Sequence, residues 1–353
     1  MTALTMPARS DEDDAALRPV PWRRMAGITW RQHRFALAGV AVLLGALAVW
    51  LWSAGTSLHN AYAAAIACHP ASSAACQNLI NIFNSSATSN VMGNKDPGGV
   101  LLQLVPALIG AFVGAPVLAR ELETGTFRFA WTQGFGRWRW TLAKLVLLGV
   151  VLAAATAAYG VLVSWYYQPY QAGGLYENSP FADLFSLREV TFPAWTVAAF
   201  TIAALAGMLI RRVVPAIVAT LAVYAGLAFA TAGFLREHYL TPLVTTSLDL
   251  PGTSTAWIIS QWFTKDGRFA FSGNPPLSLL NRFCSSAPSG KGGGLPPGPS
   301  FAQCLAPHGY TQLTSYQPAS RFWPFQWIEG GWLLALSILL IVVTIWLVRR
   351  RAA

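Results

Sequence analysis

Six long apolar runs, separated by polar connections, dominate the pattern of the 353-residue chain. A helix needs about 17–25 apolar residues to cross the hydrocarbon core of a bilayer, and each run has about that length. A backbone in lipid must satisfy its own hydrogen bonds, so we expect every run to be a helix. The predicted transmembrane helices cover residues 35–52, 100–118, 145–165, 192–210, 213–235 and 331–348. None of these runs contains Lys, Arg, Asp or Glu, so the sequence predicts a bundle interior without ionisable groups.

The composition agrees with a membrane protein, because 54% of the residues are hydrophobic and only 11% are charged. A soluble domain carries about 25% charged residues. The net charge of +10 does not indicate a nucleic-acid partner, because the bases flank the apolar runs and form no basic stretch interleaved with stacking aromatic residues. We therefore expect an all-α integral membrane protein with six transmembrane helices.

The distribution of bases predicts the orientation of these helices. Most of the 24 Lys and Arg residues fall on one side if both termini are cytoplasmic, although the connections on the other side are much longer. Cytoplasmic connections of membrane proteins are enriched in Lys and Arg. The sequence therefore predicts a multi-pass protein of the plasma membrane with both termini in the cytoplasm.

The chain begins with two cytoplasmic regions. Residues 1–20 are polar, with an acidic cluster, and predict a disordered tail. Residues 21–34 predict an amphipathic helix in the membrane interface, with an apolar arc that includes Trp22 and Met25 opposite a basic arc. The bases of this region are Arg23, Arg24, Arg31 and Arg34. The alternative is a plain positive flank that fixes the direction of the first span.

The remaining regions follow from the spans. Residues 35–235 hold the first five helices, and residues 119–144 form a hairpin between the second and third. Residues 236–329 form a long outer loop, and residues 330–353 hold the last helix with a basic tail. The outer loop contains the strand-like stretch "STAWIISQWFT" and is long enough for a small extracytoplasmic unit.

All four cysteines lie in the predicted outer loops: Cys68, Cys76, Cys284 and Cys304. An oxidising exterior favours disulfides, and four cysteines allow three pairings. The two simplest bonds are Cys68–Cys76 and Cys284–Cys304, and a cross-link between the loops is the alternative. There is no CxxC motif, so we expect no metal site.

The hairpin "ARELETGTFRFAWTQGFGRWRWTLAK" concentrates charge in a chain that otherwise avoids it. Its bases suit the orientation rule, but acidic residues contribute little to topology. Glu121 and Glu123 therefore need another explanation. They either pair with the bases across the hairpin, such as Arg137 or Lys144, or contact a soluble partner.

Motifs for chemistry are missing from the sequence. It contains no GxxxxGK[ST] phosphate-binding loop, no HExxH and no GxSxG. We therefore expect neither an enzyme nor a chain with its own energy source, and we expect no cofactor bound to this chain.

The hairpin resembles the signature between the second and third spans of type-2 ATP-binding-cassette permeases. Its residue sequence is similar to that of actinobacterial members. That signature has the form E-x-E-x-G-T, a short apolar helix, a turn, an Arg and a Lys that opens the next span. The matching residues are Glu121, Glu123, Gly125, Thr126, Arg137 and Lys144. The six-span layout, the amphipathic helix before the first span and the long last outer loop are also similar. Many members have proline in the turn, where this chain has Gly134, Phe135 and Gly136.

The resemblance implies a permease subunit of an exporter, without ATPase activity of its own. Its partners would be membrane lipid, a second permease copy or a sister permease, and a cytoplasmic nucleotide-binding ATPase that carries Mg-ATP. The ATPase-coupling residues would be Glu121, Glu123, Gly125, Thr126, Arg128 and Arg137. The alternative is a membrane sensor or assembly protein whose outer loops bind a ligand and which needs no ATPase.

Overall fold

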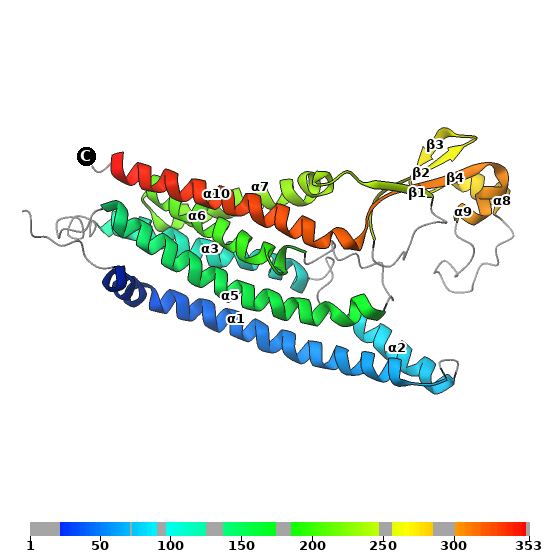
Figure 1. The fold of residues 1–353 in the computed structure, drawn as a ribbon, viewed down its shortest axis with the longest axis horizontal. Helices are drawn as coiled ribbons and strands as arrows, with labels where there is room; N and C mark the ends of the chain where they lie inside the picture. The colour runs from blue at the N-terminus through cyan, green and yellow to red at the C-terminus, as the bar shows by residue number, and fades with distance from the viewer. Residues whose placement is uncertain are drawn as a thin grey trace, which may run out of the picture.

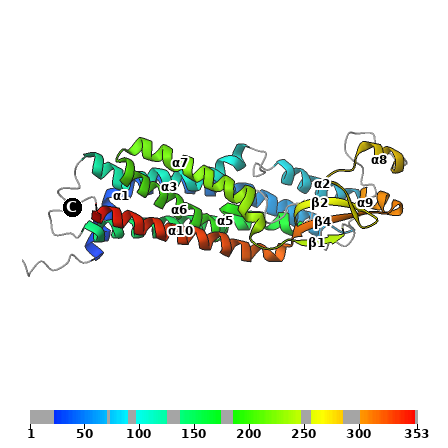
Figure 2. The ribbon, with the colours of Figure 1, turned by 90° about the horizontal axis from the view of Figure 1, so that it is seen from above.

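The computed structural model describes residues 22–70, 73–89, 97–124, 137–173, 185–246, 256–284 and 301–350. Six helices in these ranges are long and apolar enough to cross a membrane, as predicted. They form one elongated bundle (Figure 1). These helices are α1 (Trp22–Ala67), α3 (Pro97–Thr124), α5 (Arg137–Gly173), α6 (Thr191–Ile210), α7 (Val213–Ala230) and α10 (Phe322–Arg350). The start of α1 and the end of α10 lie at one end of the bundle, here called the terminal end, and a β-sheet lies at the opposite end, the sheet end (Figures 1 and 2).

Helices α3 and α6 form the centre of the bundle, and their small residues allow a very close approach. A Cβ atom added to Gly110 would lie 2.6 Å from the backbone nitrogen of Phe200. One added to Gly114 would lie 2.5 Å from the carbonyl oxygen of Phe200, and one added to Gly207 would lie 2.8 Å from that of Ala115. Small residues at such spacing let helix backbones pack closely in lipid, where the hydrophobic effect does not drive association.

We expect Gly114→Val to weaken the bundle because the added side chain must force α3 away from α6. Overpacking of this kind costs about 1–3 kcal/mol. Thermal unfolding of the purified chain in detergent would measure the loss. Gly45→Val is the matched control, because nothing lies within 4 Å of a Cβ at that position of α1. Equal stability of the two variants would show that the close approach is not required.

Helices α1 and α5 are longer than a bilayer crossing requires. The 46 residues of α1 correspond to about 69 Å of helix, and a hydrocarbon core is about 30 Å thick. The predicted first span ends at Trp52, but the helix continues to Ala67. Helix α2 (Ala74–Ser89) then packs back against α1, and Phe83 is buried beside Tyr62. The predicted first outer loop therefore begins as a helical hairpin.

One disulfide lies in this hairpin and one in the region of the sheet. Cys68 and Cys76 are bonded at the turn between α1 and α2, with their Cα atoms 5.5 Å apart. Cys284 and Cys304 are bonded across 20 residues of sequence, with their Cα atoms 5.9 Å apart. These two bonds make up the simplest of the three possible pairings, and no cross-link joins the two loops.

The region between α7 and α10 contains the small unit that its sequence predicted. Four antiparallel strands lie in the order β1-β4-β2-β3, and the stretch "STAWIISQWFT" supplies most of β2. Asp266 and Gly267 both have positive φ and form the two-residue turn between β2 and β3, as Asp-Gly pairs commonly do. The elements are β1 (Leu243–Thr246), β2 (Trp257–Lys265), β3 (Arg268–Ser272), α8 (Leu277–Phe283), α9 (Phe301–Leu305) and β4 (Tyr310–Gln317).

Short helical turns connect the bundle to this unit. A π-helical turn (Thr231–Leu235) and a 3₁₀ turn (Arg236–His238) continue α7 toward β1. Further 3₁₀ turns lie at Phe185–Leu187, Ala306–His308 and Ala319–Arg321. Because β4 leads through the last of these turns into α10, that helix begins at Phe322, well before the predicted residue 331. Glu329 therefore lies inside the helix and not before it.

Candidate functional site

Glu121, in the charged connection, has a partner within the chain. It lies near the end of α3 and accepts a hydrogen bond from Lys144 Nζ in the first turns of α5, and the two form an ion pair. The Lys144 side chain is 1% exposed, and its Nζ lies 4.5 Å from the centroid of the Trp140 ring. Removal of one member of such a buried pair leaves the other charge uncompensated. The pair therefore fastens the end of α3 to the start of α5.

Glu123 contacts a third helix. Its Oε2 atom accepts a hydrogen bond from the backbone N–H of Val213, at a distance of 3.4 Å. Val213 is the first residue of α7, where backbone N–H groups have no partner within the helix and a negative charge is favourable. Glu123 is exposed, so this contact is weaker than the Glu121–Lys144 pair. The two carboxylates together link α3 to α5 and α7.

The other predicted coupling residues are only partly covered by the structure. Gly125, Thr126 and Arg128 lie outside the described residues. Arg137 is the first residue of α5, and nothing is described of its side chain. Their predicted role in coupling stays a prediction.

The predicted interfacial helix is the first part of α1. Figure 1 shows its first turns, in the darkest blue, bent away from the axis of the remaining helix. Trp22, Arg23, Arg31 and Arg34 are exposed, and the side chain of Arg24 is outside the description. Met25 and Thr29 are buried, so this part of the apolar arc packs against protein. Arg23, Arg31 and Arg34 are exposed, and the placement of this segment in the membrane interface stays a prediction.

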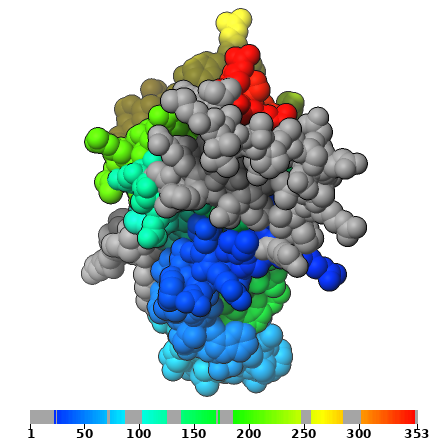
Figure 3. Space-filling model, turned by 90° about the vertical axis from the view of Figure 1, so that its left-hand side faces the viewer, coloured from blue at the N-terminus to red at the C-terminus, as the bar shows by residue number. Residues whose placement is uncertain are grey.

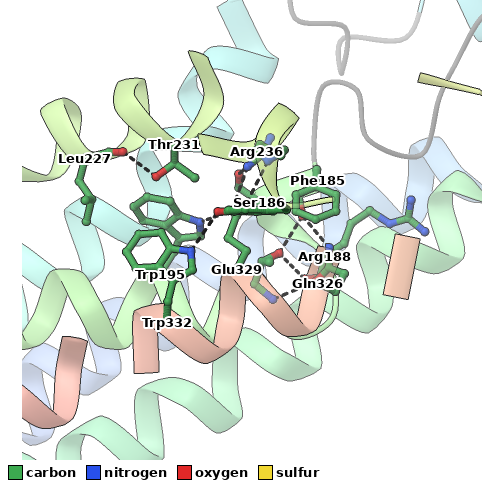
Figure 4. Close-up of polar contacts among 12 residues, drawn as sticks. Phe185, Ser186, Arg188, Trp195, Leu227, Thr231, Arg236, Gln326, Glu329 and Trp332 are labelled. Atoms are coloured by element: carbon green, nitrogen blue, oxygen red, sulfur yellow. Dashed lines mark hydrogen bonds and ion pairs between the residues drawn. The ribbon is translucent and has the colours of Figure 1, made fainter. Parts of the chain in front are cut away.

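A second candidate site lies at the sheet end and is built around Glu329 of α10, whose side chain is fully buried (Figure 4). Arg236 donates from its Nε to one carboxylate oxygen at 2.9 Å and from a terminal nitrogen to the other at 2.9 Å. Trp195 of α6 donates its Nε1–H to Glu329 at 2.8 Å. Such a bidentate, charge-assisted arrangement is strong and fixes geometry. Glu329 therefore joins α6, the end of α7 and α10.

Neighbouring side chains extend this buried network. Arg236 also donates to the Ser186 hydroxyl at 3.0 Å, and its guanidinium lies 4.4 Å from the centroid of the Phe185 ring. Tyr239 donates to Glu329 at 3.5 Å and accepts a hydrogen bond from Trp332 at 2.9 Å. Burial and the Glu329 carboxylate raise the pKa of Tyr239, which keeps its phenol protonated as a donor.

Gln326 lies one helical turn before Glu329 and fastens the start of α6. Its side-chain oxygen accepts from the backbone N–H of Thr191 at 3.0 Å, and its side-chain nitrogen donates to the carbonyl of Phe185 at 3.1 Å. Both groups belong to a helix start or a short turn, which lack partners within regular structure. The sheet end of the bundle is thus held by side-chain amides and charges.

A third polar cluster lies beside α5, just before α6. The Ser164 hydroxyl of α5 donates a hydrogen bond to Glu189, and Arg188 forms an ion pair with Glu189 at 3.7 Å. Burial lowers the pKa of Arg188, and the Glu189 carboxylate opposes that effect. This cluster therefore connects α5 to the residues just before α6.

The prediction of a bundle interior without ionisable groups is wrong. Lys144 and Glu329 lie within helices that can span the membrane, and both are buried. They lay outside the predicted runs because a hydropathy pattern marks only the most apolar part of each helix. The spacing of Gln326 and Glu329, three residues apart in an otherwise apolar and aromatic stretch, would have placed both on one face of a helix.

The six helices that can span a membrane define a multi-pass membrane protein. A family model supports this class: the model described as "ABC-2 membrane transporter related" matches residues 41–236. The chain belongs to that family, and the match covers most of the first predicted span, the next four spans and the charged connection. A search of curated proteins and a search of solved structures find no match.

Proposed function

We propose that this chain is the permease subunit of an ATP-driven exporter and that a separate cytoplasmic ATPase, which carries Mg-ATP, docks at its terminal end. The observation that carries the proposal is the position of the two motif carboxylates. They lie at the end of α3, directly before the connection at residues 125–136, and they fasten α3 to α5 and to α7. A movement of that connection, driven by the ATPase, would therefore be transmitted to α3, α5 and α7.

The charges and disulfides support a cytoplasmic terminal end. Exposed arginines gather at that end of the helices: Arg23, Arg31, Arg34, Arg120, Arg211, Arg212, Arg349 and Arg350. An excess of Arg and Lys marks the cytoplasmic side of membrane proteins. Both disulfides lie toward the opposite end, which suits an oxidising exterior.

The packing of the bundle suggests how such a movement would reach the membrane interior. Helix α3 packs closely against α6 along the face that holds Gly110 and Gly114. We therefore expect the two helices to move together as one rigid body. Helices α1, α7 and α10 expose apolar faces instead, which suits lipid or a second permease copy. A shift of the α3–α6 pair against these outer helices is the motion that we expect to drive export.

The test is co-purification of the tagged full chain from its native membranes in mild detergent. We expect a subunit with a P-loop in the complex, and Mg-dependent ATP hydrolysis that the chain stimulates after reconstitution in vesicles. A tagged six-span protein of another family, handled in parallel, is the control. Recovery of the chain without any P-loop subunit, or hydrolysis that is independent of the chain, would favour a membrane sensor or assembly protein.

A further inference from the structure

An arginine pair at the terminal end has no role in the coupling contacts. The Arg139 guanidinium of α5 and the Arg349 guanidinium of α10 lie 5.8 Å and 5.0 Å from the centroid of the same Trp138 ring. The Arg139 guanidinium also lies 5.8 Å from the ring centroid of Trp22. Two cations at one ring bring together the start of α1, the start of α5 and the end of α10. The terminal end, where α1 begins and α10 ends, faces the viewer in Figure 3.

These two arginines have no anionic partner among the described residues. Neither forms an ion pair there, and the two carboxylates described at this end, Glu121 and Glu123, already bind Lys144 and the Val213 backbone. The Nε atom of Arg139 is buried and has no hydrogen-bond partner within the described ranges. Buried donors are normally satisfied, so this group indicates an acceptor outside the described residues.

The exposed residues of α10 give the level of this pair in the membrane. A stripe of exposed apolar side chains, Leu334, Ile338 and Val342, runs along the helix at a spacing of four residues. The next position of the stripe is the exposed Trp346, and the guanidinium of Arg350 lies 4.4 Å from its ring centroid. Tryptophans mark the interface between hydrocarbon and water. Arg349 therefore lies at the level of the lipid headgroups.

We propose that Arg139 and Arg349, with Trp138 between them, bind the headgroup phosphate of an anionic phospholipid. A guanidinium matches the geometry of phosphate oxygens through paired hydrogen bonds, which the terminal N–H groups of the two arginines can donate. Neither residue belongs to the amphipathic segment at residues 21–34, and the proposal does not depend on the coupling function.

The surroundings favour a lipid over an acidic surface of a partner protein. Trp22, Trp138 and Trp346 are all exposed beside cations. On α10 the exposed apolar stripe ends at Trp346, at the level of the two arginines. Such a stripe is typical of a helix face that contacts lipid. A bound lipid would join the ends of three helices at the side of the bundle.

The experiment is native mass spectrometry of the purified full chain in detergent, titrated with dioleoyl phosphatidylglycerol or dioleoyl phosphatidylcholine. We expect roughly tenfold tighter binding of phosphatidylglycerol, since each base near an anionic headgroup contributes measurably. Arg139→Gln with Arg349→Gln should reduce that preference to within about twofold. Arg211→Gln with Arg212→Gln is the matched control, because it removes two exposed charges at the same end without touching the tryptophans.

Each other outcome would overturn the proposal. An equal loss of the phosphatidylglycerol preference in both double variants would mean that the overall positive charge of this end attracts the lipid, and not a site at Arg139 and Arg349. Displacement of the lipid by inorganic phosphate at similar concentrations would indicate a soluble phosphate ligand. Unchanged lipid binding with loss of the co-purified ATPase would indicate a protein-docking surface. If the double variant fails to fold, Arg349→Gln alone changes an exposed side chain near the end of α10, and we expect it to weaken the preference about threefold.

Discussion

Glu329→Leu is expected to destabilise the bundle by about 3–5 kcal/mol, because it leaves the buried Arg236 guanidinium without its carboxylate. Glu329 is fully buried and receives hydrogen bonds from both Arg236 and Trp195. The substitution should lower the thermal unfolding midpoint of the purified chain in detergent by many degrees. Unfolding of α6, the end of α7 and the start of α10 should then occur together, since the carboxylate joins all three.

Two further variants decide whether the ion pair is the cause. Arg236→Leu combined with Glu329→Leu removes both charges, and we expect it to recover most of the lost stability, because an apolar pair needs no compensation. Glu237→Gln alters a neighbouring carboxylate that pairs with the exposed His238 ring, and should change stability by less than about 0.5 kcal/mol. A combined variant no more stable than Glu329→Leu alone would contradict this explanation.

Glu121→Lys is expected to abolish the stimulation of ATP hydrolysis by the permease, with at least a tenfold loss of the stimulated rate. The substitution places a second positive charge beside Lys144, which is 1% exposed and cannot reach solvent without a local rearrangement. We expect a cost of about 3 kcal/mol at the junction of α3 and α5. The measurement is chain-stimulated hydrolysis in reconstituted vesicles with the partner ATPase.

The charge-swapped variant Glu121→Lys with Lys144→Glu separates an internal contact from an external one. It restores the ion pair within the chain but changes the charge presented to a partner. Recovery of stimulation would support the internal role. Failure to recover, although the internal ion pair is restored, would point to contact of Glu121 with the ATPase. Glu123→Lys should reduce stimulation only about twofold, because its contact with Val213 is exposed.

Much of this fold could be predicted because bilayer thickness restricts what a chain can do. Six apolar runs, long enough to cross and free of charge, leave few arrangements other than six helices. The short sequence distances within the pairs Cys68–Cys76 and Cys284–Cys304 made them the simplest disulfides, and the structure contains both. The continuation of α1 to Ala67 was not predicted. A helix that extends beyond the membrane into water does not need a continuous apolar run, so hydropathy does not mark it.

The candidate sites were predicted less completely, for a physical reason. The E-x-E motif identified Glu121 and Glu123 as unexplained by topology, but their partners are 23 and 90 residues away in the sequence. Arg236 and Glu329 lie 93 residues apart and read as ordinary loop charges at the edges of two apolar runs. Hydropathy measures each residue against its sequence neighbours and not against the residues that fold onto it.

The sequence by itself determined the six spans, the family resemblance and the special character of the carboxylates at the end of α3. Each of these depends on local composition or on a short motif, which a linear pattern contains. Only the tertiary structure decided that Glu121 binds Lys144, that Glu123 meets the first residue of α7, and that Glu329 is buried against Arg236. These pairings depend on how helices distant in sequence pack in space, because a buried charge is stable only where packing supplies its partner.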